Sequence, residues 1–147
     1  LIFVGTRTNC EELSVNLKAH AGWEVLTLHG DKDQIDRDRI FRAFKKQEVR
    51  ILIATDVASR GLDVPHIRNV VCFDVPRDKD AHTHRIGRTG RAGEVGDAHI
   101  LLTPKDKVAA GYVVHSLMEV GQVVTEDLMK LACQNPGFRL KGAGDRG

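Results

Sequence analysis

The sequence has little of what marks several large classes of protein. It contains only three cysteines, Cys10, Cys72 and Cys133, and their odd number and wide spacing fit neither a disulfide framework nor a zinc site. No stretch reaches the roughly 18 apolar residues of a membrane span, and no secretory signal is visible. These absences predict reduced thiols in an intracellular protein that has no membrane as its partner.

A phosphate-binding loop is also missing, because Gly-Lys-Ser/Thr occurs nowhere in the chain. We therefore expect that the chain alone does not hold a nucleoside triphosphate in the usual manner. The formal net charge of +2 is too small for a generally basic, DNA-coating protein, so any nucleic-acid contact must come from local arrangement. The chain begins LIFVG without Met, which predicts a fragment of a longer protein.

Short apolar runs alternate with helical patterns along most of the 147 residues. Strands are expected at 1–4, 23–28, 50–54, 70–73 and 98–102, and helices from residue 8 through Leu17 and at 33–46, 79–88, 105–120 and 125–134. Val15 and Ile35 are assigned to the apolar sides of the first two helices, and Trp23 is interpreted as a packing residue. Thr8 and Glu11 resemble a capping box at the start of the first helix, and Thr125 is an N-cap candidate for the last. The order predicts an α/β domain over 1–134 with a mostly parallel sheet and helices on both faces. Residues 135–147 are expected to form a flexible, basic, Gly-rich tail.

Small and polar residues follow the first four expected strands. They are Gly5-Thr6, His29-Gly30-Asp31, Thr55-Asp56 and Asp74. Ligands of open α/β sheets bind at the carboxyl ends of the strands, where backbone N–H groups suit a phosphate. Ordinary strand-to-helix turns favour the same residue types, so the position alone leaves both interpretations open.

Two stretches sharpen the ligand interpretation. In ATDVASRGLD, Thr55 could donate to a phosphate, Gly61 would allow close backbone approach and Asp63 could accept from a sugar hydroxyl. The alternative is a long loop in which Asp56 pairs with Arg60. In QIDR, Gln34 and Arg37 share one helical face, and Arg37 is the better ligand candidate of the basic residues that follow. The others are interpreted as a solvated helix surface: Arg39, Arg42, Lys45 and Lys46.

The stretch HRIGRTGR, residues 84–91, places Arg85, Arg88 and Arg91 at three-residue intervals between glycines. No acidic residue follows until Glu94, so neighbours in the sequence supply no counter-ion. Arginine engages phosphate through a rigid fork of donors. An arginine cluster can instead be solvated or paired with distant acids, but the glycine spacing favours an anion.

The ordered motifs LIFVGT, LHGD, QIDR, ATDVASRGLD and HRIGRTGR resemble the second, C-terminal RecA-like domain of a DEAD-box RNA helicase. The endings HRIGRTGRAGE and LLTPKD are most similar to the splicing-associated branch. The resemblance implies a three-layer RecA-like sandwich. It also implies an N-terminal RecA-like domain upstream, because the DEAD sequence and the phosphate loop are not in this chain.

The resemblance also assigns site residues. Arg88 and Arg91 match the catalytic arginines that reach the γ-phosphate of ATP, which is bound with Mg²⁺ mainly by the N-terminal domain. The remaining matches divide by role: Gly61 and Asp63 contact the ATP ribose side; His84 and Arg85 dock the two domains; Thr6, Gly30, Gln34, Arg37 and Thr55 grip the RNA backbone. No metal ligand is expected in this chain.

The resemblance implies an RNA-stimulated ATPase that unwinds short duplexes or remodels ribonucleoproteins, with RNA, the N-terminal domain and spliceosomal proteins as partners. It implies a nuclear rather than a cytoplasmic location, and predicts that this chain alone is inactive. Two alternatives stay open: a related motor that acts on DNA, and a RecA-like scaffold whose phosphate-facing residues are idle.

Overall fold

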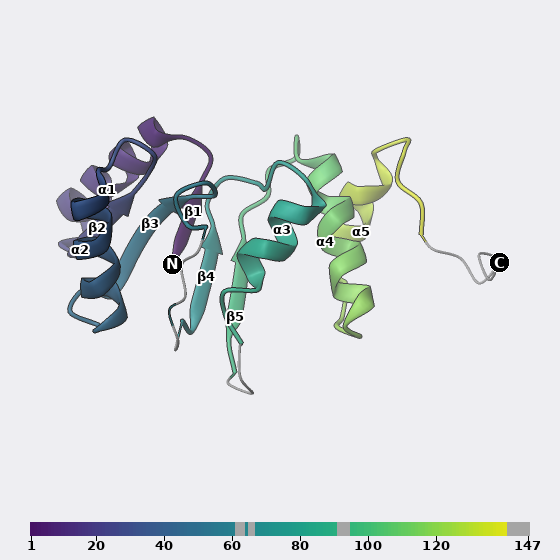
Figure 1. Cartoon of the computed structure of the whole chain (residues 1–147). Helices are drawn as coiled ribbons and strands as arrows, with labels where there is room; N and C mark the ends of the chain where they lie inside the picture. Colours follow the sequence, from purple (N-terminus) through teal and green to yellow (C-terminus); the bar gives the residue numbers. More distant parts are fainter. Residues whose placement is uncertain (61–63, 65–66, 91–94, 141–147) are drawn as a thin grey trace. The chain divides into compact units, whose positions relative to one another are not determined.

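The computed structural model describes residues 1–60, 64, 67–90 and 95–140 (Figure 1). The chain forms two compact units. Unit 1 comprises Leu1–Val75 and His84–Leu101, and unit 2 comprises Pro76–Thr83 and Leu102–Gly147. The sequence interpretation assigns 1–134 to one domain, and this range includes parts of both units.

A parallel sheet forms the centre of unit 1 (Figure 1). Its strands are β1 (Ile2–Val4), β2 (Val25–Leu28), β3 (Ile51–Thr55), β4 (Asn69–Cys72) and β5 (Asp97–Ile100). They lie in the order β2-β3-β1-β4-β5, and every neighbouring pair is parallel. The predicted strand positions and the predicted parallel α/β class are therefore confirmed. Because all strands run the same way, their carboxyl ends share one edge.

Helices α1 (Arg7–Ala21) and α2 (Gln34–Lys45) cover opposite faces of this sheet. Phe3 and Leu52 point to the face where α2 contributes Ile40 and Phe44. Alternate strand residues, including Val4 and Ile53, pack with Cys10, Leu13 and Leu17 of α1. This alternation follows from the two-residue period of a strand, and it produces the predicted layers of helix, sheet and helix.

Several details of the sequence interpretation are wrong. The N-cap of α1 is Thr6, whose hydroxyl accepts from the Asn9 N–H at 3.1 Å, and not Thr8. Three apolar residues expected to pack are instead exposed: Val15 at 63%, Trp23 at 53% and Ile35 at 81%. Val15 and Ile35 are exposed because each helix turns only one stripe toward the sheet and they lie outside the covered stripes. Trp23 lies in the connection between α1 and β2.

Unit 2 is helical. Helix α3 (Lys79–Ile86) begins in unit 2 and ends in unit 1, whereas α4 (Lys107–Glu119) and α5 (Glu126–Cys133) belong to unit 2. The α4–α5 core contains Ala110, Val114 and Ala132. The hydroxyl of Thr125 accepts from the Leu128 N–H at 3.3 Å, so the predicted N-cap is confirmed.

The packed chain of unit 2 extends past the predicted boundary at residue 134. Phe138 packs against the α4–α5 core, and its ring stacks on His115 with centroids 5.2 Å apart. His115 Nε2 donates to the Arg139 carbonyl at 2.8 Å. Residues 138 and 139 are thus held on α4 rather than forming part of a flexible tail; 141–147 lie outside the described residues.

Candidate functional site

The first four strands end in polar segments at one edge of the sheet. Asp74, which follows β4, accepts from the Gly5 N–H at 2.7 Å and from Asn9 Nδ2 at 3.1 Å. One carboxylate therefore joins the end of β4 to the end of β1 and to the first turn of α1. A carboxylate bonded in this way is a structural connector, so Asp74 helps to define the edge on which the other polar residues lie.

Arg85 lies inside unit 1, with 1% of its surface exposed. Its Nε and Nη2 donate to Asp56 Oδ1 and Oδ2, each at 2.8 Å, and its Nη1 donates to the Asp74 carbonyl at 2.6 Å. The guanidinium carbon also lies 5.3 Å from the centre of the Phe3 ring. Arg85 thus connects the ends of β3 and β4, and its counter-ion comes from 29 residues away in the chain.

The charges of this cluster follow from its burial. Burial alone would lower the pKa of Arg85, but the hydrogen bonds and negative charge of Asp56 raise it above its ordinary value. Arg85 is therefore a permanent cation in a bidentate pair. The structure gives this side chain an intrachain role that the sequence interpretation did not foresee, and it excludes the suggested pair between Asp56 and Arg60 as the main contact of Asp56.

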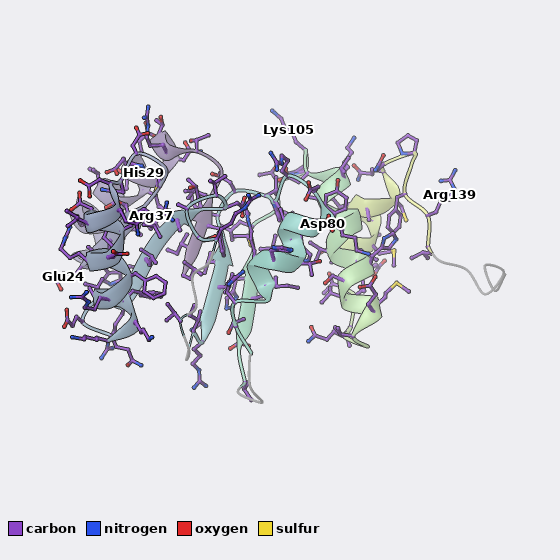
Figure 2. All side chains as sticks on the ribbon, viewed as in Figure 1. Glu24, His29, Arg37, Asp80, Lys105 and Arg139 are labelled. Atoms are coloured by element: carbon purple, nitrogen blue, oxygen red, sulfur yellow. The ribbon has the colours of Figure 1, made fainter. Side chains whose placement is uncertain are left out.

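The predicted RNA-binding residues lie on two sides of the β2 end. Gln34 and Arg37 line a pocket of about 250 Å³ with Leu28, Asp38, Phe41, Ala58 and Arg60. Arg37 Nη2 donates to the Ala58 carbonyl at 3.2 Å, which fixes its direction, and Gln34 Nε2 donates to Asp38 at 2.9 Å. Figure 2 shows Arg37 and His29 toward the carboxyl ends of the strands. The pocket offers a guanidinium and an amide beside an apolar wall.

Thr6 and Gly30 lie on neighbouring loops, and both are exposed. A Cβ added to Gly30 would meet no atom within 4 Å, and its φ lies outside the left-handed region. Neither packing nor backbone conformation therefore requires glycine at this position, and the space above its backbone is open. Thr55 is half-buried at the end of β3, where its carbonyl accepts from the Ser59 N–H at 3.1 Å.

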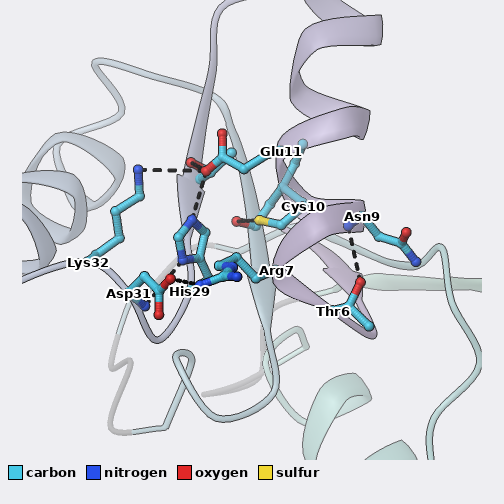
Figure 3. A network of polar contacts seen from close by, with 10 residues as sticks. Thr6, Arg7, Asn9, Cys10, Glu11, His29, Asp31 and Lys32 are labelled. Atoms are coloured by element: carbon cyan, nitrogen blue, oxygen red, sulfur yellow. Dashed lines mark hydrogen bonds and ion pairs between the residues drawn. The ribbon is translucent and has the colours of Figure 1, made fainter.

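A polar network connects these two loops, and the sequence interpretation missed it (Figure 3). His29, only 6% exposed, lies with Nε2 2.7 Å from Glu11 Oε1 of α1. Arg7 pairs with Asp31, and Lys32 Nζ lies 3.8 Å from Glu11. The hydrogen bond from His29, with smaller effects of Lys32 and Thr27, lowers the pKa of Glu11 despite its partial burial. The one sequence feature that could have indicated this network is the position of His29 between an apolar strand and a glycine.

The arginine-rich stretch turns back toward the sheet after α3. The Arg88 N–H donates to the Arg85 carbonyl at 3.2 Å, and Arg88 is half-buried. The hydroxyl of Thr89 lies 2.5 Å from the Ile67 carbonyl and 2.9 Å from the Arg68 carbonyl, just before β4. His84 is exposed on α3. Three predicted site residues, Gly61, Asp63 and Arg91, lie outside the described residues.

The described ranges of the chain contain neither a metal-binding cluster nor a membrane-spanning helix. Within them, no group of three His, Cys, Asp or Glu side chains is arranged to hold a metal ion. No helix in the same ranges is both long and apolar enough to cross a membrane.

Proteins similar to this chain include ATP-dependent RNA helicases. The chain matches the family described as "Helicase conserved C-terminal domain" over residues 1–93. It is 52% identical over 139 residues to the ATP-dependent RNA helicase DDX42 of Mus musculus, an alignment that covers 95% of this chain and 15% of that protein. The DEAD-box splicing factor Prp28 of yeast has a similar structure, with a TM-score of 0.81 at 30% identity over 95% of this chain and 31% of that chain. Dbp5 of S. cerevisiae bound to RNA and ADP BeF3 matches with a TM-score of 0.71 at 33% identity, over 90% of this chain and 36% of that chain.

The parallel sheet between α1 and α2, with polar residues along its carboxyl edge, thus defines a RecA-like domain. The chain belongs to the helicase conserved C-terminal domain family, as a C-terminal RecA-like domain of the DEAD-box type. The resemblance seen in the ordered motifs of the sequence is thereby confirmed. The chain spans about 15% of the length of curated relatives such as DDX42.

Proposed function

We propose that this domain is one half of an RNA-stimulated ATPase, and that it acts together with an N-terminal RecA-like domain of the same polypeptide. The observation that carries the proposal is the carboxyl edge of the sheet in unit 1. There Thr6 and Gly30 follow β1 and β2, Thr55 is the last residue of β3, and the Gln34–Arg37 pocket opens beside β2. Dbp5, a structural relative, was solved with RNA and a nucleotide analogue bound.

In the proposed mechanism, the RNA backbone lies along this edge. The Arg37 guanidinium and the Gln34 amide donate to phosphate oxygens, and Gly30 admits the backbone because the space above it is open. The hydroxyls of Thr6 and Thr55 contact phosphates or 2′-hydroxyls. Contacts of this kind carry little base specificity, which suits a protein that binds RNA of many sequences. Bending of the held strand would unpair a short duplex or displace bound protein.

ATP, with its Mg²⁺, is placed mainly on the N-terminal domain. Arg88 and Arg91 of this chain then act as the arginine fingers that stabilise charge at the γ-phosphate during water attack. Gly61 and Asp63 face the ribose side, and His84 contacts the N-terminal domain. Arg85 holds the stretch in place through Asp56 rather than touching the nucleotide. Because RNA and ATP both favour the closed pair of domains, each strengthens the binding of the other.

The test is the full-length protein with Arg91→Ala. Loss of an arginine finger lowers turnover by about 10³-fold or more, so RNA-stimulated ATP hydrolysis should fall by that factor at saturating RNA. RNA binding without nucleotide should not change. Arg77→Ala is the matched control, because its side chain is 87% exposed and lies away from the stretch in sequence. Unchanged turnover in Arg91→Ala would contradict the finger assignment.

Two parts of the proposal need separate measurements: that RNA rather than DNA stimulates ATP hydrolysis, and that the chain alone is inactive. ATP hydrolysis by the full-length protein should be stimulated by single-stranded RNA and not by DNA of the same sequence; equal stimulation by DNA would indicate a DNA motor. The chain of 147 residues alone should hydrolyse no ATP. Its RNA affinity should fall with salt by a slope of about 0.7 per neutralised phosphate. Spliceosomal or other ribonucleoprotein partners and a nuclear location are part of the same proposal.

A further inference from the structure

The hydrogen bonds of His29 fix the orientation of its imidazole and also hold the loop after β2. The Asp31 N–H can only donate, and it lies 3.3 Å from His29 Nδ1, so Nδ1 is the accepting nitrogen. The proton of a neutral imidazole is then on Nε2, which donates to Glu11 Oε1 at 2.7 Å. Both ring nitrogens are thus used, one toward the backbone of the loop after β2 and the other toward α1.

The loop itself turns tightly around this histidine. The Lys32 N–H donates to the His29 carbonyl at 3.1 Å, so residues 29–32 form one turn with Gly30 and Asp31 in its centre. The imidazole also binds the turn from inside, through the Asp31 N–H. Since His29 is 6% exposed and Gly30 is exposed, the imidazole forms the buried support of an exposed glycine.

The other end of the network is the start of α1. Glu11 lies on the first turns of α1, whose N-cap is Thr6. A second contact runs in parallel, because Arg7 of the same helix pairs with Asp31 of the turn. Glu11 also accepts from the Thr27 hydroxyl at 3.3 Å, which ties α1 to β2 itself. Two segments that the proposed function assigns to RNA binding, Thr6 and Gly30, are therefore held at a fixed separation (Figure 3).

We infer that Glu11 and His29 are positioning residues for RNA: they hold the Gly30 turn against the N-terminus of α1 so that both segments meet the same stretch of sugar-phosphate backbone. This inference rests on the proposed function. Neither side chain is placed to touch the RNA, because His29 is buried and the carboxylate of Glu11 would repel phosphate. Their effect is preorganisation, which lowers the entropy that must be lost when RNA binds.

The experiment uses the full-length protein and measures ATP hydrolysis as a function of single-stranded RNA concentration. His29→Leu keeps an apolar body of similar size but lacks both nitrogen contacts. The RNA concentration for half-maximal stimulation should rise about five- to tenfold, as expected for the loss of one net hydrogen bond in preorganisation. Turnover at saturating RNA should stay within about twofold, because the arginine stretch is untouched. His20→Asn, an exposed histidine of α1, is the matched control and should behave as the wild type.

Two conservative variants distinguish the contributions of the two ring nitrogens of His29 to RNA binding. His29→Asn keeps an acceptor close to the Nδ1 position but does not reach Glu11, whereas His29→Gln keeps a donor close to the Nε2 position but offers the turn no acceptor. Each should recover part of the RNA affinity lost in His29→Leu. In a double-mutant cycle, Glu11→Ala combined with His29→Leu should weaken RNA binding by less than the sum of the two single changes, because both break the His29–Glu11 bond although each also removes a contact of its own.

The outcomes are distinguishable. If wild-type protein shows no RNA-stimulated hydrolysis, the proposed function fails. If the wild type is stimulated and His29→Leu needs the same RNA concentration as His20→Asn, the positioning inference alone is overturned. A loss of turnover at saturating RNA without a change in the RNA requirement would also overturn it. Thermal unfolding of each variant accompanies the assay, and additive losses in the double-mutant cycle would show that the two residues act separately.

Discussion

The pair of Arg85 and Asp56 predicts an asymmetric response to substitution. Both bonds of the pair are 2.8 Å long, but the Arg85 side chain is 2% exposed and that of Asp56 is 40% exposed. Removing one partner of a buried pair costs about 3–5 kcal/mol, chiefly because the other charge stays buried without compensation. The decrease in the free energy of unfolding should therefore depend on which of the two charges remains without its partner.

Asp56→Ala leaves the inaccessible guanidinium without its carboxylate, so we expect the free energy of unfolding to fall by about 4–5 kcal/mol. Arg85→Met leaves a carboxylate that water can reach, and the methionine side chain still covers Phe3. Its cost should be nearer 2–3 kcal/mol, since solvent screens the remaining charge. The double variant should cost less than the sum of the two.

The assay is urea unfolding of the chain, followed by fluorescence of Trp23, the single tryptophan, and by circular dichroism. With a slope of about 1–3 kcal/mol per molar urea, a difference of about 2 kcal/mol separates the two midpoints by roughly 1 M. Equal losses in the two single variants, or a larger loss in Arg85→Met, would refute the reasoning. Strict additivity in the double variant would show that the side chains do not act as a pair.

Two further predictions concern packing and thiol chemistry. A Cβ on Gly96 would overlap Thr89 Oγ1 and would lie 2.5 Å from the Gly90 nitrogen. Gly96→Ala should therefore lower the free energy of unfolding by about 2–3 kcal/mol. Gly30→Ala, where a Cβ would meet nothing within 4 Å, should change it little. Burial raises the pKa of the Cys10 thiol to about 11 and also raises that of Cys72, whereas Cys133 is exposed. A thiol reagent at neutral pH should modify one cysteine per chain rapidly and all three only after unfolding; fast reaction of two would contradict the burial of one of them.

The elements could be predicted from the sequence because their signals are local. Apolar runs such as RILIA gave the strands, and Thr125 gave the start of α5. Exposure was less predictable, because which stripe of a helix is covered depends on the sheet beneath it. Ile35 fits the apolar pattern of α2 but lies outside the covered stripe, at 81% exposure.

The candidate site was predictable to the extent that its motifs are contiguous. The QIDR spacing correctly placed Gln34 and Arg37 on one face, and the structure puts both in one pocket. Partners far apart in the chain were not predictable: no local pattern shows that Arg85 meets Asp56, or that Glu11 meets His29. The assignment of Arg85 to domain docking stays a prediction beside this intrachain pair.

The buried pair also sets the charge that the arginine stretch can offer to a polyanion. The sequence counts three cations over residues 84–91, but Asp56 neutralises Arg85 inside the protein. The stretch therefore presents at most two positive charges, and fewer counter-ions are displaced when an anion binds. The dependence of nucleotide binding on ionic strength should accordingly reflect at most two arginines. It should stay the same in any variant that replaces Arg85 and Asp56 together with neutral residues and still folds.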